Sequence, residues 1–226
     1  ILIEVNILVT VVVGGFFGDE GKGKVAAYLG MREGFTLAIR TGAINAGHTV
    51  IYNGKEYRFR ALPCASLRKD IDVLIAPGAL IRLDVFFDEL DLIGRRENIF
   101  VDRHTGIITE EHVKKEVEDE YLTMKIGSTR QGVGAAMADR VMRKLKLAKD
   151  YEELKEFVID GLELIDKHRE EGSILIEGTQ GTFLSLYHGT YPYVTSRDTT
   201  APGILSDVGI GPKYVEEIVL VFKSFV

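Results

Sequence analysis

The sequence predicts an α/β protein with a mostly parallel central sheet flanked by helices, and two observations support this class. Short β-branched, apolar runs alternate along the chain with segments of helical periodicity. A glycine-rich loop follows the first apolar run and precedes the first helical segment, which is the order found in α/β folds that bind phosphate. We therefore expect a P-loop-like phosphate site in a single α/β domain spanning residues 1–226.

The expected strands are recognised by their β-branched content. Ile1–Val13 is nearly continuous in apolar character, which is typical of a buried parallel strand. Strands are predicted at Val11–Val13, Leu37–Ile39, Val73–Ile75, Ile99–Val101, Ile174–Ile176 and Ile218–Phe222. Because the last of these is followed by neither a turn nor a polar tail, we expect the chain to be incomplete at its C-terminus.

The expected helices lie between the strands and carry apolar residues at helical spacing. They are predicted at Lys22–Leu29, Asp84–Ile93, Glu110–Tyr121, Ala135–Lys149 and Tyr151–Glu171. The third is so rich in charge that we expect it to be solvated. Val50–Phe59 interrupts the alternation and contains Asn53-Gly54, which predicts a β-hairpin insertion.

Composition excludes several classes of protein. The 226 residues carry a net charge of −6, which argues against wholesale nucleic-acid binding. The single cysteine, Cys64, excludes an internal disulfide and favours a reducing, cytoplasmic location. Apolar runs stay below the roughly 18 residues that a membrane span needs.

The glycine loop, Gly14–Lys24, is the sharpest feature of the sequence. Glycines allow backbone N–H groups to approach an anion, and the following helix adds partial positive charge. Gly18–Lys24 fits the G-x-x-x-x-G-K pattern, although Val25 stands where a Walker loop has Ser or Thr. Asp19 lies within the loop, where a carboxylate is repelled by phosphates unless it contacts a metal or handles a proton. A merely flexible turn is the weaker alternative.

A second cluster follows the second predicted strand and includes Asn45-Ala-Gly-His48-Thr49. Together with Gly18-Asp-Glu-Gly-Lys-Gly-Lys24 it resembles the adenylosuccinate synthetase family. Lys125–Gly134 is similar to the family's IMP-phosphate loop, and Glu177–Thr182 and His188–Ser196 are similar to two further motifs. The resemblance spans nearly the whole chain, in the family's order.

This resemblance implies a GTP-dependent ligase of AMP synthesis. GTP phosphorylates the 6-oxygen of IMP, and aspartate then displaces that phosphate to give adenylosuccinate. By resemblance, Asp19 is the base at N1 of IMP and a ligand of Mg²⁺, whose shell the Gly47 carbonyl completes. His48 is the acid at the 6-oxygen, and Lys22 neutralises the moving phosphoryl group.

The resemblance also implies the binding residues. The GTP phosphates would be held by Gly18, Asp19, Glu20, Gly21, Lys22, Gly23, Lys24, Gly47, His48 and Thr49. IMP would be held by Asn45, Thr129, Gln180 and Thr195, together with Arg143 from a neighbouring subunit. The last contact implies a homodimer.

Several residues depart from the family pattern. Phe16-Phe17 stands where the family usually has Gln-Trp, and Gln131 replaces an arginine. Arg130 replaces a glycine, so we expect strain if that position requires a positive φ. Two alternatives stay open: a non-catalytic relative that binds IMP alone, and a P-loop GTPase-type binding module, against which Val25 counts.

Overall fold

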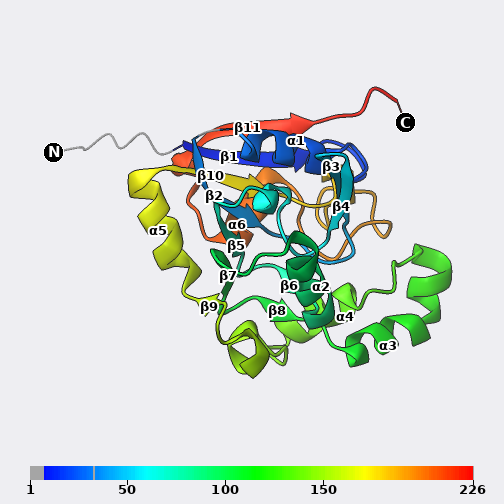
Figure 1. Cartoon of the computed structure of the whole chain (residues 1–226). Coiled ribbons are helices and arrows are strands. Elements are labelled where there is room, and N and C mark those ends of the chain that lie inside the picture. Colours follow the sequence, from blue (N-terminus) through cyan, green and yellow to red (C-terminus); the bar gives the residue numbers. More distant parts are fainter. Residues whose placement is uncertain (1–7, 33, 226) are drawn as a thin grey trace.

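A seven-stranded sheet forms the centre of the computed structural model, which describes residues 8–32 and 34–225 (Figure 1). Its order is β11-β1-β10-β2-β5-β7-β9, and every neighbouring pair is parallel. The strands are β1 (Leu8–Gly14), β2 (Phe35–Arg40), β5 (Asp72–Ile75), β7 (Ile99–Asp102), β9 (Val158–Ile159), β10 (Ser173–Glu177) and β11 (Val215–Val221). The predicted fold class is confirmed; residues 1–7 of the predicted first strand lie outside the described residues.

Two smaller pairs of strands accompany the sheet. The predicted hairpin is β3 (His48–Tyr52) and β4 (Lys55–Phe59), antiparallel around Asn53-Gly54. The second pair, β6 (Leu80–Ile81) with β8 (Gly106–Ile107), is parallel and too short to be recognised from sequence.

Six α-helices lie among the described residues. They are α1 (Lys22–Gly30), α2 (Leu83–Ile93), α3 (Glu110–Glu118), α4 (Val133–Val141), α5 (Gly161–Glu171) and α6 (Ala201–Val208). The first three agree with prediction, except that α3 ends earlier and is followed by a π-helical turn at Tyr121–Ile126.

Two helix predictions are wrong in extent. The helix predicted at Ala135–Lys149 ends at Val141, because Arg143 adopts a left-handed φ of 61° and the chain turns back to pair with Gly106. The helix predicted at Tyr151–Glu171 begins only at Gly161, where the Asp160 side chain accepts a hydrogen bond from the Leu162 amide at 3.1 Å. The preceding residues supply edge strand β9. Helix α6 was not predicted.

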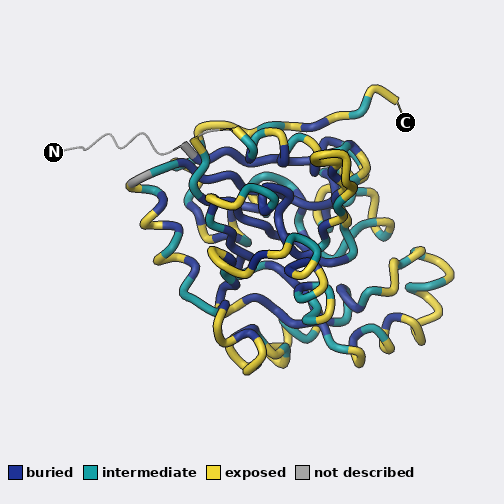
Figure 2. Tube along the Cα trace, in the orientation of Figure 1, coloured by how far each residue is buried: buried dark blue, intermediate teal, exposed yellow. Residues whose placement is uncertain are grey.

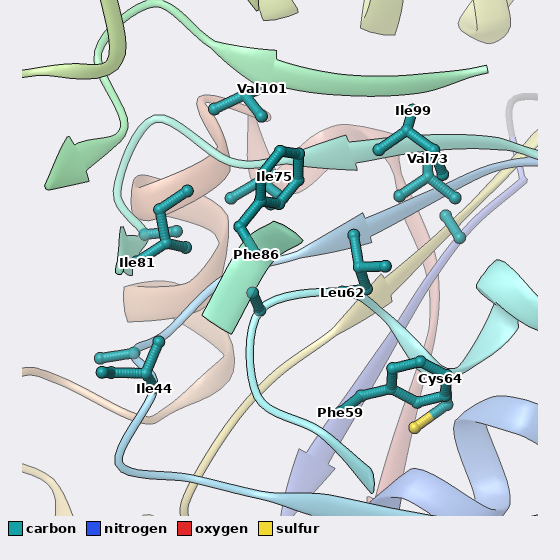
Figure 3. Close-up of a cluster of buried hydrophobic side chains, with 14 of the residues drawn as sticks. Ile44, Phe59, Leu62, Cys64, Val73, Ile75, Ile81, Phe86, Ile99 and Val101 are labelled. Carbon is teal, nitrogen blue, oxygen red and sulfur yellow. The ribbon is translucent and has the colours of Figure 1, made fainter. Parts of the chain in front are cut away.

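The core lies on both faces of the sheet, because successive strand residues point to opposite sides. On one face, α1 and α2 cover residues such as Val12 and Ala38; on the other, α5 and α6 cover Leu37 and Ile39. Figure 2 shows this buried centre, and Figure 3 shows Phe86 of α2 among the side chains of the first face. Burying a side chain of this size stabilises the fold by about 1.5–3 kcal/mol. Within the described ranges, no helix is long and apolar enough to cross a bilayer.

The charged helix α3 is less solvated than expected. It lies beside α4 at the periphery of the molecule, at the lower right of Figure 1. Even so, His112 is only 7% exposed and Glu116 only 3% exposed. The prediction of a fully solvated helix is therefore wrong for one of its faces.

The sheet order determines where a site can form. Because β11, β1, β10 and β2 are consecutive neighbours in a parallel arrangement, the loops that follow them converge at one edge. The glycine loop follows β1, and Gly178-Thr179-Gln180 follows β10. Thr41–Gly47 follows β2, and Lys223 lies just after β11.

Candidate active site

Three converging loops are tied together by hydrogen bonds. Gln180 Nε2 donates to Asn45 Oδ1 at 2.9 Å, which links the loop after β10 to the loop after β2. Thr182 Oγ1 donates to the carbonyl of Gly14 at 2.9 Å, which links the first of these to the glycine loop. Gln180 is held in a left-handed conformation with a φ of 55°. Residues far apart in sequence thus form one connected edge.

The glycine loop is organised from within by Glu20. Its Oε1 accepts hydrogen bonds from the amides of Phe16 (2.8 Å) and Gly18 (2.9 Å), while Oε2 lies 2.7 Å from Lys22 Nζ. Lys22 Nζ also donates to the Gly18 carbonyl at 3.1 Å, and both charged side chains are fully buried. Gly21 precedes α1 with a φ of 90°, which a glycine adopts without strain. Glu20 therefore shapes the loop; the phosphate contact that the resemblance implies for it stays a prediction.

Asp19 lies in the same loop, next to Glu20. Its carboxylate is largely exposed and lies 2.5 Å from the ammonium of Lys223, which follows β11. This hydrogen bond, with the charges of Lys223 and Lys22, lowers the pKa of Asp19. Sequence reasoning did not select Lys223, although its position after the strand beside β1 could have suggested the contact.

A cavity of about 710 Å³ opens beside these loops. Polar side chains from four separate segments face it: Asn45, Thr129, Gln180 and Thr195. Gly18, Asp19 and Gly47 also line it, and Phe17 and Tyr193 add aromatic surface. The cavity thus gathers every residue predicted to bind IMP except Arg143.

The turn that carries Thr129 has unusual backbone geometry. Arg130 adopts a φ of 56°, so the expected positive φ is confirmed at the position where the family usually has glycine. Gln131, the other departure, accepts a hydrogen bond through Oε1 from Arg60. Arg60 in turn donates to the carbonyl of Ile44 at 2.6 Å, which connects this turn to the loop after β2.

His48 lies behind the loops in a buried polar cluster. Its Nδ1 contacts Glu177, which also pairs with Arg40 and accepts the Cys64 amide at 2.8 Å. The same Nδ1 also lies 2.6 Å from Arg40 Nη1, which only donates, whereas the Glu177 carboxylate only accepts, so these contacts are compatible with either neutral tautomer. Burial, with the nearby charge of Arg40, lowers the pKa of His48 to about 4. Within residues 8–32 and 34–225, Nε2 has no hydrogen-bond partner. His48 is therefore neutral at pH 7 in this arrangement.

Glu177 keeps its charge despite complete burial. Burial raises its pKa, but Arg40 and the hydrogen bond from His48 outweigh this and bring the pKa to about 2. The donor atoms of His48, Cys64 and Glu177 lie within 4.8 Å of one another. Arg40 already supplies the positive charge at Glu177, and burial raises the pKa of Cys64, so this trio is poorly suited to a metal ion.

Other predicted residues do not line the cavity. Lys24 and Thr49 are exposed on α1 and β3, and Gly23 is buried against His48. Arg143 lies on the exposed turn after α4. The structure therefore brings together the predicted IMP residues and Asp19, but not the full set predicted for GTP.

Comparison with known proteins identifies related chains. The family model described as adenylosuccinate synthetase matches residues 11–151 and 145–226. The adenylosuccinate synthetase of Pyrococcus horikoshii is 46% identical over 220 residues, which cover 95% of this chain and 65% of the relative. That of Methanocaldococcus jannaschii is 46% identical over 221 residues, which cover 96% of this chain and 64% of the relative. The chain thus spans about 65% of the length of these curated relatives.

Solved structures agree with the sequence relatives. The structure of fully ligated adenylosuccinate synthetase from Plasmodium falciparum matches with a TM-score of 0.88 and 25% identity, over 96% of this chain and 62% of that one. The succinoaminodeoxyadenylate synthetase of cyanophage S-2L, bound to dGMP and to dATP as an energy donor, matches with a TM-score of 0.83 and 27% identity. The match covers 96% of this chain and 64% of that one.

Proposed function

Because the chain belongs to the adenylosuccinate synthetase family, we propose that it carries the IMP-binding and phosphoryl-transfer part of a GTP-dependent ligase. In this reaction GTP phosphorylates the 6-oxygen of IMP, and the amine of aspartate displaces that phosphate to form adenylosuccinate. The observation that carries the proposal is the gathering of Asp19, Asn45, Thr129, Gln180 and Thr195 around one cavity.

The cavity suits a nucleoside monophosphate in size and lining. Its volume of about 710 Å³ lies within the range of roughly 300–1,000 Å³ typical of small-molecule sites. The paired amides of Asn45 and Gln180 offer a donor and an acceptor for a purine edge. Thr129 and Thr195 offer hydroxyls from two other walls, so the ligand would be oriented from several sides.

The glycine loop would hold the GTP phosphates. Phosphoryl transfer demands little covalent chemistry from a protein, so placement and charge neutralisation dominate. In this structure the Lys22 ammonium is neutralised by Glu20, which lies in the same loop. We propose that bound phosphates compete with Glu20 for Lys22, so that the Lys22 ammonium pairs with the nucleotide in place of Glu20.

Asp19 is the residue that suits Mg²⁺. Its carboxylate already attracts a cation, the ammonium of Lys223, and carboxylate and carbonyl oxygens are the ligands that this metal takes. The Gly47 carbonyl belongs to a residue lining the same cavity. When bound, Mg²⁺ would offset negative charge on the phosphates, and Asp19 would accept the N1 proton of IMP.

His48 would act only after the phosphates arrive. Its imidazole is neutral at rest, so a positively charged, proton-donating imidazolium requires that the negative charge of a bound ligand raise its pKa. Glu177 at Nδ1 would stabilise the imidazolium that then forms. The buried, unprotonated state is therefore the resting state of this residue.

We also propose that the protein forms a homodimer through the outer surface of α4. Arg143 is exposed there, and the neighbouring Val141, Met142 and Tyr187 are 71%, 62% and 73% exposed. An apolar surface beside a cation is typical of an interface. In the dimer, Arg143 would reach the IMP phosphate of the partner subunit.

Two broader proposals accompany these. We assign residues 1–226 to one domain, because both core clusters share a single sheet. We place the protein in the cytoplasm, because Cys64 is a buried free thiol and a lone cysteine is typical of reducing compartments.

Isothermal titration with IMP and with GTP tests the proposal. We expect saturable IMP binding, weakened by Thr195→Ala because one hydroxyl contact is lost. Such a contact contributes about 0.5–1.5 kcal/mol, or roughly two- to tenfold in affinity. Thr190→Ala, in the same loop but outside the cavity wall, is the matched control. Binding of GTP without IMP would favour the GTPase-type module instead.

A further inference from the structure

The carboxylate of Glu116 is a buried group beside the cavity that the proposed chemistry does not use. It lies on α3, is 3% exposed and lines the wall of the 710 Å³ cavity. Its Oε1 accepts the Gly134 amide at 2.5 Å, and its Oε2 accepts the Gly132 amide at 2.9 Å and Ser128 Oγ at 3.2 Å. One side chain thus holds the loop that leads into α4 at three points.

The hydrogen bond from Ser128 extends this hold to both neighbours of Thr129. Ser128 Oγ also accepts the backbone amide of Arg130 at 3.1 Å. Arg130 is the residue with a φ of 56°, a conformation that a non-glycine residue keeps only when its surroundings impose it. Glu116, acting through Ser128, therefore fixes the residues on either side of Thr129.

A second contact holds α3 itself against α4. His112 Nδ1 accepts the Thr109 amide at 2.9 Å, so Nε2 carries the hydrogen and donates to Asp139 of α4 at 3.1 Å. Between the two helices the backbone is tightly packed. A Cβ atom on Gly132 would lie 2.8 Å from the amide nitrogen of Val113. The position of Glu116 relative to the loop is thus fixed by packing as well as by hydrogen bonds.

We propose that Glu116 is a positioning residue that presents Thr129 to the phosphate of the bound nucleotide; this inference rests on the proposed function. The amides at the start of α4 would otherwise attract that phosphate. Glu116 occupies them, and its negative charge repels a second anion. The phosphate is therefore directed to the Thr129 end of the loop, and the nucleotide binds in one orientation in the cavity.

Two measurements on Glu116→Gln test this role. The first is hydrogen exchange of the Gly132 and Gly134 amides without nucleotide. Exchange should accelerate by about tenfold or more, because glutamine offers one acceptor oxygen and a competing NH₂ group. The second is the affinity for IMP relative to inosine, which lacks the phosphate. The preference for IMP should fall by about tenfold while inosine affinity stays the same, a split that general destabilisation does not produce.

Matched variants complete the design. Glu118→Gln lies on the same helix, where the Glu118 side chain is 65% exposed and pairs with Lys114; it should leave both measurements unchanged. Glu116→Asp keeps the charge on a shorter side chain and should give intermediate values, which also serves if the glutamine variant does not fold.

The proposal is overturned if the two amides of Glu116→Gln exchange at the wild-type rate, or if the IMP-to-inosine preference is unchanged or increased. A wild-type protein that binds no IMP would instead refute the proposed function. The exchange measurement would still decide whether Glu116 anchors the loop.

Discussion

Replacing Glu177 by glutamine should destabilise the fold strongly, because it removes the carboxylate that the buried guanidinium of Arg40 contacts. The two residues are 1% and 2% exposed, so water cannot take over the role of the lost charge. Glutamine preserves the shape of the side chain, and the effect therefore reports on the lost charge together with the acceptor oxygen that becomes an NH₂ group. Breaking a buried ion pair by removing one partner costs about 3–5 kcal/mol, a large part of the about 5–15 kcal/mol that stabilises a typical domain.

Urea unfolding at pH 7, followed by circular dichroism, gives the measurement. Glu56→Gln is the control, because its pair with Arg58 is 51% and 75% exposed and such surface pairs contribute little. The double variant Arg40→Met with Glu177→Gln should recover much of the loss, because it removes the unpaired charge as well. Equal midpoints for Glu177→Gln and Glu56→Gln would refute this reasoning.

Three further outcomes are expected. The free energy of unfolding should fall as pH drops from about 6.5 to 4, because only the unfolded chain protonates His48 in that range. It should fall again from about 4.5 to 2, because the unfolded chain protonates Glu177 before the folded protein does. A flat profile from pH 7 to 3 would contradict both pKa shifts. Gly132→Ala should lower the melting temperature more than Gly127→Ala, since both have a φ near 75° but only Gly132 lacks room for a Cβ; equal shifts would argue against close packing on α3. Arg143→Leu should weaken IMP binding without lowering the melting temperature, and sedimentation should show whether the dimer persists; an unchanged IMP affinity would remove Arg143 from the site.

The sequence was most informative where a structural element depends on a short, local pattern. The glycine loop, the Asn53-Gly54 hairpin and the long β-branched strands are encoded by neighbouring residues, and all were predicted. Strand β9 has only two residues, which is too few for any periodicity. The apolar spacing through Tyr151–Glu171 therefore predicted a continuous helix, whereas in the structure this segment contains β9, the edge strand of the sheet.

Contacts between distant residues could not be read from such patterns. Lys223 meets Asp19 across 204 positions, and Arg40 meets Glu177 across 137. Each pair depends on which strands are neighbours in the sheet. Strand order follows from the packing of helices on both faces and not from the sequence of any one strand. The candidate cavity residues were identified by resemblance, whereas the charges that hold them in place required the fold.

Helix α3 shows this distinction within a single element. Glu116 and Glu118 lie two positions apart in the same charged segment, and nothing local marks one of them as buried. They differ because two positions along a helix correspond to a rotation of about 200°, so one carboxylate faces α4 and the other faces solvent. The buried carboxylate is tolerated because backbone amides and a hydroxyl satisfy its oxygens. The same interactions hold the loop beside Thr129, so the charge that stabilises this corner of the fold also shapes the wall of the cavity.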